Sequence, residues 1–166
     1  MSDTRSKMEP KYMTLKSKTK VWIGDLSYVL SEAMWEQVIS ELPKKDVYED
    51  IVTVKNEAGE TFEVAIFSTY SGNGTYEDED GVEYSVKSGT LGVVPVEAID
   101  PSVGETELGF GLVEKARHDV CITYYGADGT ISIETDREII DIYTNKDRID
   151  IMEPIEMKKF GDLWKK

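Results

Sequence analysis

The chain has 166 residues, of which 40% are hydrophobic, with nine Tyr, four Phe and three Trp. This length suits one domain that buries roughly two thirds of the surface of its unfolded chain, and the aromatic content excludes a disordered body. The net charge of −14 is divided into +4 over residues 1–20, −21 over 21–157 and +3 over 158–166. We therefore expect a flexible basic arm at 1–20, a single acidic domain over 21–157 and a basic C-terminal tail at 158–166.

Cysteine content and hydropathy restrict the class of protein further. Cys121 is the only cysteine, so an internal disulfide is excluded. The sequence shows neither a secretory signal nor an apolar run of the roughly 18 residues that a membrane helix needs. An acidic body repels phosphates, which disfavours direct binding of nucleic acid by the body. We expect a cytoplasmic protein with no membrane contact, and the pattern predicts no particular oligomeric state.

The first element predicted after the arm is an interrupted strand. Residues 21–23 form a short apolar run that ends at Gly24 and Asp25. Three large apolar residues then recur at every second position, at Leu26, Tyr28 and Leu30. Alternation with period two is typical of a strand, and the break at Gly24 indicates a bulge or bend.

A helix follows and is the clearest single element. Ser31 is a good N-cap, Glu32 suits the first turn, and Pro43 marks the end. The apolar residues recur with the helical spacing i, i+3, i+4 and i+7, at Trp35, Val38, Ile39 and Leu42. The sequence predicts a helix over 31–42 whose apolar stripe covers a sheet.

The rest of the chain has the pattern of strands and turns. Alternating apolar residues, separated by turn-rich segments such as 56–60 and 126–129, predict strands over 51–54, 61–66, 82–86, 89–96, 118–125, 130–135 and 139–143. Pro95 indicates an edge strand or a strand end. The fold class predicted is α+β, with a mostly antiparallel twisted sheet or open barrel and one main covering helix. Residues 157–166 fit two forms, a short amphipathic helix or a strap that docks on the body.

Three strings in the middle of the chain carry a resemblance to known proteins. They are WIGDLSYVL at 22–30, SGNGTY at 71–76 and DGVEYSVKSGTLG at 80–92. With them the chain resembles a group of small uncharacterised proteins encoded by tailed bacteriophages and some bacteria. The resemblance implies a phage or bacterial origin and an α+β or mainly β fold, and it implies no catalytic residue.

No metal, cofactor or catalytic motif is predicted. In a calcium loop with Gly81 at its sharp turn, the end positions fall on Tyr76 and Lys87, where carboxylates are required. His118 and Cys121 lie on opposite faces of a regular strand, which excludes a local Cys–His pair. We expect His118 to be a surface residue at a strand start and Cys121 to be a small buried hydrophobe.

The function predicted is binding without catalysis. A dense acidic surface attracts proteins whose own grooves are positive, such as host proteins that handle nucleic acid. We expect a phage accessory or anti-defence factor that binds such a basic surface, with contacts from one acidic hairpin tip at Glu77, Asp78, Glu79, Asp80 and Glu83. Solubility alone is an equally simple reason for the acidity.

The alternative is a small-ligand protein, for instance one that sequesters a nucleotide. Its binding residues would come from the Gly-rich loop and from the interrupted strand, at Asp25, Tyr28, Tyr70, Asn73 and Tyr76. An acid between apolar neighbours is costly unless it bonds backbone amides, so bracing of a turn is the favoured role of Asp25 and ligand contact the other. An enzyme is the third possibility.

Overall fold

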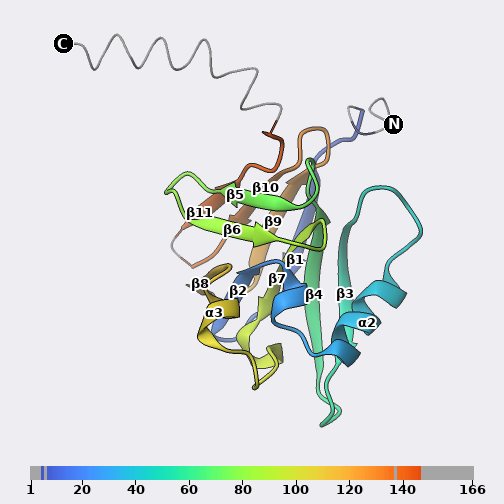
Figure 1. Ribbon diagram of the computed structural model, residues 1–166, viewed down its shortest axis with the longest axis vertical. Coiled ribbons are helices and arrows are strands. Elements are labelled where there is room, and N and C mark those ends of the chain that lie inside the picture. The colour runs from blue at the N-terminus through green and yellow to red at the C-terminus, as the bar shows by residue number, and fades with distance from the viewer. Residues whose placement is uncertain (1–4, 6, 137, 147–166) are drawn as a thin grey trace, which may run out of the picture.

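The structure is a computed structural model, and it describes residue 5, residues 7–136 and residues 138–146. This part of the chain is 16% helical and 42% strand, with two helices and eleven strands in antiparallel sheets that do not close into a barrel. Two sheets lie one behind the other, and a separate hairpin lies at one end of them (Figure 1). The predicted α+β class with a twisted antiparallel sheet is confirmed.

The larger sheet has five strands in the order β3-β4-β7-β2-β8. Their bounds are β2 Lys20–Gly24, β3 Glu49–Lys55, β4 Thr61–Ser68, β7 Thr90–Pro95 and β8 Leu112–Lys115. The predicted hairpin over 51–66 is present as β3 and β4. Pro95 is the last residue of the central strand β7. A proline has no N–H to donate to a neighbouring strand, and this loss is tolerated at a strand end.

The second sheet has four strands in the order β1-β9-β10-β11, and the remaining two form a hairpin. The bounds are β1 Lys11–Leu15, β9 Val120–Tyr125, β10 Thr130–Glu134, β11 Ile139–Ile142, β5 Gly74–Glu77 and β6 Glu83–Val86. Asp78, at the end of β5, forms a bridge with Ile142 of β11. The hairpin β5–β6 is thereby attached to the outer edge of the four-stranded sheet.

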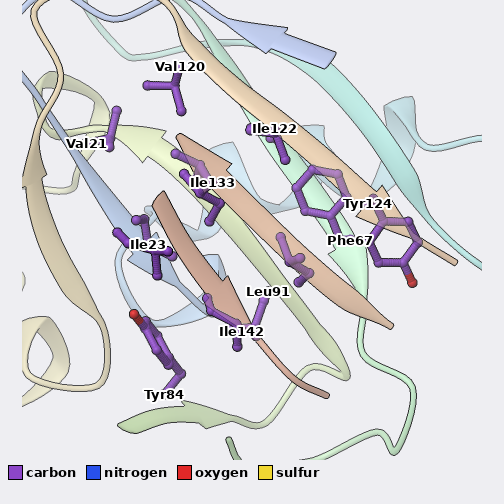
Figure 2. Packing of buried hydrophobic residues seen from close by; sticks show 14 of the residues in the cluster. Val21, Ile23, Phe67, Tyr84, Leu91, Val120, Ile122, Tyr124, Ile133 and Ile142 are labelled. Atoms are coloured by element: carbon purple, nitrogen blue, oxygen red, sulfur yellow. The ribbon is translucent and has the colours of Figure 1, made fainter. Parts of the chain in front are cut away.

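The main core lies between the two sheets. Side chains from β2, β4 and β7 meet side chains from β9, β10 and β11, and Tyr84 of the hairpin lies at one end (Figure 2). Tyr76 of the hairpin belongs to the same cluster. The rings of Phe67 and Tyr124 stack across this interface with their centres 5.2 Å apart. Strand alternation places every second residue of these strands in this core, which explains the period-two pattern of the sequence.

A second core lies on the other face of the five-stranded sheet. Helix α2 (Glu32–Glu41) covers it with Met34 and Val38, and the short helices η1 (Leu26–Tyr28) and η2 (Val96–Ala98) complete the layer. Trp22 is fully buried there, and its Nε1–H donates to the carbonyl of Leu108 at 2.9 Å. Leu108 ends helix α3 (Glu105–Leu108), which lies in the connection between η2 and β8.

The expected arm at residues 1–20 is wrong for the part of it that the structure describes. Lys11–Leu15 is strand β1, paired with β9, and Leu15 is fully buried. Arg5 donates from Nη2 to the hydroxyl of Tyr124 at 2.8 Å. The strand went unrecognised because it turns only Met13 and Leu15 toward the core, which is too short a pattern to stand out among lysines. The tail at 158–166 lies outside the described residues.

Three further expectations need correction. Leu26 and Tyr28 belong to η1, not to a strand, because Asp25 caps this turn by accepting the N–H of Ser27. Ile39 is 50% exposed, since α2 turns Met34 and Val38 toward the sheet. Cys121 is exposed, because the alternate residues of β9 take the core side.

Candidate binding surface: the acidic face

Acidic side chains from separate stretches gather around the β5–β6 hairpin. We call this set the acidic face, and it comprises Glu77, Glu79, Asp80, Glu83, Glu114, Glu138 and Asp141. The members come from the hairpin, from β8 and from the segment that leads into and forms β11. Glu77 and Glu83 lie directly opposite each other on the outer side of the hairpin, and both are exposed.

The electrostatic coupling among these carboxyls shows that they lie close together. A hydrogen bond with Asp141, followed by the negative charge of that residue, raises the pKa of Glu79 above its ordinary 4.5. Burial raises the pKa of Glu114, and the charges of Glu138, Asp78 and Asp80 raise it further. Both shifts mean that the neighbouring negative charges oppose ionisation, which is the signature of a concentrated negative field.

Cations in the part of the chain that the structure describes do not neutralise this field one by one. Over the described residues, the ion pairs within 4.0 Å are Lys45–Asp50 at 3.4 Å and Arg117–Asp136 at 3.1 Å. Neither pair includes a member of the acidic face. The carboxylates of the face are therefore available to a positively charged partner.

Asp78 does not belong to the exposed part of the predicted hairpin tip. It is only 8% exposed, and its Oδ1 accepts the N–H groups of Asp80 and Val82 at 2.9 and 3.0 Å. Its Oδ2 accepts the hydroxyl of Tyr84 at 2.7 Å. Burial, followed by this hydrogen bond to a carboxylate, raises the pKa of Tyr84. Asp78 is thus a structural residue of the turn, and a role in partner contact does not fit its burial.

Asp25 has the bracing role that was favoured for it. Its side chain is fully buried and accepts five hydrogen bonds. Oδ1 accepts from the N–H and hydroxyl of Ser27 and from the hydroxyl of Ser88, at 2.7 to 3.0 Å. Oδ2 accepts the N–H groups of Lys87 and Ser88, both at 2.8 Å. This carboxylate joins η1 to the segment between β6 and β7, and no acceptor capacity is left for a ligand.

The four other residues of the alternative ligand site do not form one cavity with it. Tyr76 is buried, and its hydroxyl donates to the carbonyl of Gly72 at 2.7 Å. Tyr70 lies under the Arg5 guanidinium, 4.8 Å from the ring centre. Tyr28 packs at 4.6 Å against the ring of Phe110, and Asn73 is exposed. These four side chains therefore contact separate partners in the fold.

A groove of about 610 Å³ lies elsewhere, and none of those five residues lines it. It runs between the connection from β1 to β2 and the part of the β3–β4 hairpin next to its turn. Its charged lining includes Lys16, Lys18, Glu63, Glu97 and Asp119. No ion pair within 4.0 Å joins these groups to one another in the described chain. The sequence offered no signal for this groove, because its walls come from five separate segments.

The residues described contain no group of three or more His, Cys, Asp or Glu side chains arranged to hold a metal ion. None of the helices in this part of the chain combines the length and the apolar character that crossing a membrane requires. His118 is exposed and precedes β9.

Comparison with protein-family models, with curated proteins and with solved structures finds no match for this chain.

Proposed function

We propose that this chain is a non-enzymatic acidic binding protein, a phage accessory or anti-defence factor that inhibits a host protein which handles nucleic acid. The observation that supports it is the convergence of carboxylates from the hairpin, β8 and β11 into one face that no cation of the described residues ion-pairs. Such a face resembles the phosphate backbone in charge and competes for the same basic groove. The residues expected to contact the partner are Glu77, Glu79, Asp80 and Glu83, together with the neighbouring Glu138 and Asp141. Asp78 is left out because it is buried.

Binding by this face is dominated by charge, so it weakens as salt increases. A partner that uses several Lys or Arg side chains forms charge-assisted hydrogen bonds with the exposed carboxylates. Because the acids belong to antiparallel strands and a tight turn, they are already held in place before binding. Binding therefore costs less conformational entropy than it would if a flexible acidic tail had to become ordered.

The test is charge reversal at the face against charge reversal elsewhere. The face variant is Glu79→Lys/Asp80→Lys/Glu83→Lys, and the matched control is Glu36→Lys/Glu41→Lys/Glu57→Lys, three exposed acids of α2 and the β3–β4 turn. Both change the net charge equally. Immobilised chains are exposed to bacterial lysate at low and raised salt, and any retained protein is purified and assayed for nucleic-acid binding with and without the chain.

We expect the face variant to lose at least tenfold in retention and in inhibition, while the control retains both. Equal retention by the two variants would show that the total charge, and not this face, attracts the partner. A retained protein whose nucleic-acid binding is unchanged would refute the inhibitory role.

A second candidate function is binding of a small zwitterionic ligand in the groove. The lysines Lys16 and Lys18 suit a carboxylate or phosphate, and Glu63 and Asp119 suit an ammonium group. A ligand that binds only the native state raises the melting temperature with concentration. A thermal-shift screen with amino acids and aminophosphates tests this, and a variant Lys16→Ala/Lys18→Ala should lose any shift observed.

A further inference from the structure

One edge of the five-stranded sheet is open for pairing. Strand β8 is the last in the strand order, and among the described residues it pairs only with β2. Figure 1 shows it as the outermost strand on its side of the sheet. An unpaired edge presents N–H and C=O groups that can pair with another extended chain.

The hydrogen bonds around β8 show which of its backbone groups point outward. The N–H of Ala116, one residue past the strand, donates to the carbonyl of Thr19 at 2.8 Å, on the β2 side. Hydrogen-bonded pairs alternate along an antiparallel ladder, so the backbone groups of Glu114 also point toward β2. The N–H and C=O groups of Val113 and Lys115 therefore point away from the sheet, and no hydrogen bond joins them to another described residue.

The open stretch has defined ends. Before β8, the carbonyl of Phe110 accepts the N–H of Ser85 at 3.2 Å. After it, the carboxylate of Asp136 accepts the N–H of Arg117 at 3.0 Å. Between these two bonds there is room for an added segment of about five residues.

The opposite edge of the same sheet, strand β3, is partly closed. The side chain of Gln37 on α2 donates from Nε2 to the carbonyl of Lys55 at 2.8 Å, and its Oε1 accepts the N–H of Lys55 at 2.8 Å. This side chain occupies the place that an added strand would take. At Val113 and Lys115 of β8, in contrast, strand addition displaces no bond of the described structure.

The open edge is continuous with the acidic face. Glu114 belongs to that face, and Glu138 and Asp80 lie close to it. Leu112 packs against the main core, and alternate residues share a face, so Glu114 points to the same side of the sheet. Val113 points to the other side and is 47% exposed. A strand added beside β8 therefore places every second side chain over the acidic face and the intervening ones beside Val113.

We propose that the partner adds an extended segment to β8 as a further antiparallel strand, with Lys or Arg opposite Glu114 and an apolar residue opposite Val113. This mode of recognition rests on the proposed function, since it specifies how a basic partner meets the acidic face. Main-chain hydrogen bonds hold the segment, and the alternating side chains select its sequence. The antiparallel direction is that of the sheets in the described fold.

Peptide probes of identical charge separate strand pairing from simple attraction. The probe is Lys-Val-Lys-Val-Lys with acetyl and amide ends. In the proposed pairing its valines turn their N–H groups toward β8, and its lysines turn theirs away. One version is N-methylated at both valines, and the matched version is N-methylated at two of the lysines. Each is titrated into the full-length ¹⁵N-labelled chain, and binding is followed by NMR.

We expect the unmodified and the lysine-methylated probes to bind with dissociation constants within threefold of each other and to shift the amide signals of Val113 and Lys115 most. The valine-methylated probe should bind at least tenfold more weakly. Equal binding by all three probes would overturn strand addition and leave the charge-based proposed function standing. The absence of saturable binding by the unmodified probe at millimolar concentration would also overturn it. Discrimination among the probes without inhibition of any host protein would refute the proposed function and not the open edge.

Two proline variants locate the site on the chain. Val113→Pro removes an outward N–H of β8. The matched control is Thr53→Pro at an exposed position of β3. The carbonyl of Tyr48 accepts the N–H of Ser68 at 2.9 Å, so by alternation Thr53 turns its N–H away from β4. Proline is tolerated in an edge strand where the N–H faces solvent, and urea midpoints check that both variants fold.

We expect Val113→Pro to lose at least fivefold in affinity for the unmodified probe, while Thr53→Pro keeps it. Equal affinities of the two folded variants would overturn the assignment to β8. If Val113→Pro does not fold, the methylated probes on the unaltered chain decide the question.

Discussion

Asp25 and the acidic face show two opposite uses of carboxylates in one domain. Asp25 is fully buried and accepts five hydrogen bonds, whereas Glu77, Glu79, Asp80 and Glu83 are exposed and have no ion-pair partner in the described residues. A buried carboxylate with all of its lone pairs satisfied stabilises the fold, and an exposed cluster destabilises it slightly through repulsion. Charge in the first region therefore serves structure, and charge in the second is available for binding.

The largest effect is expected at Asp25. Asp25→Ala leaves the N–H groups of Lys87 and Ser88 without their acceptor in a buried site, which costs about 3 kcal/mol or more of unfolding free energy. Urea denaturation followed by fluorescence measures the loss. Asp80→Asn, at an exposed position, is the control and should not lower the midpoint. Similar urea midpoints for Asp25→Ala and Asp80→Asn would show that Asp25 stabilises the fold no more than an exposed acid does.

Asp78 sharpens the comparison, because it belongs to the acidic hairpin in sequence and to the buried class in structure. Asp78→Ala removes the acceptor of two backbone N–H groups and of the Tyr84 hydroxyl, and we expect a loss of about 2 kcal/mol. Adding Tyr84→Phe removes the orphaned hydroxyl, so the double variant should recover part of this loss. A double-mutant cycle by urea denaturation measures the coupling. If the stability changes of Asp78→Ala and Tyr84→Phe were strictly additive, the hydrogen bond between these two side chains would not contribute to stability.

A smaller effect, of opposite sign, is expected at Glu79. Its raised pKa means that the native state binds more protons than the unfolded state between pH 4.5 and the raised value, so stability falls as pH rises through this window. Glu79→Gln removes the negative charge beside Asp141. The variant should be more stable than the unaltered chain at neutral pH, and the difference should vanish on acidification through the window. Urea midpoints over a pH series test this, and a pH-independent difference would refute the coupling.

The smallest effect on stability is expected at Glu83. Glu83→Gln removes one exposed charge that makes no hydrogen bond in the described structure, so the urea midpoint should not change measurably. The same substitution should lower the salt dependence of partner retention, because each contacted charge contributes to it. A clear loss of stability would place Glu83 with Asp25 and Asp78 as a structural acid.

Much of the fold was predictable where the pattern is local. The helix cap at Ser31 and the hairpin of β3 and β4 follow from one capping residue, one turn and a sufficient run of alternation. Strands β1, β5 and β8 were missed, since they have only four or five residues; β1 and β8 also pair with strands distant in sequence. The packing around Trp22 was hidden for the same reason. A Cβ on Gly24 or on Gly111 would collide with the Trp22 ring, and no local pattern reveals this contact.

The candidate site was predictable in its chemistry and only partly in its membership. The hairpin acids were recognised because they are contiguous. Glu138 and Asp141 join them through the attachment of the hairpin to β11, and Glu114 joins them because the edge strand β8 of the other sheet lies nearby. The exposure of Cys121 and of Ile139 was equally hidden, because period two defines two faces and does not say which face is buried.

The amino-acid sequence by itself determined the acidity of the body, the helix start and the turns, because these depend on composition and on residues within a few positions of one another. The tertiary structure alone decided which carboxylates are buried. The amides that bind Asp25 come from 62 and 63 residues away, and the partner of Glu79 lies on another sheet. Desolvation and long-range hydrogen bonds arise only when distant segments meet, so the division between structural and binding acids is a property of the folded chain.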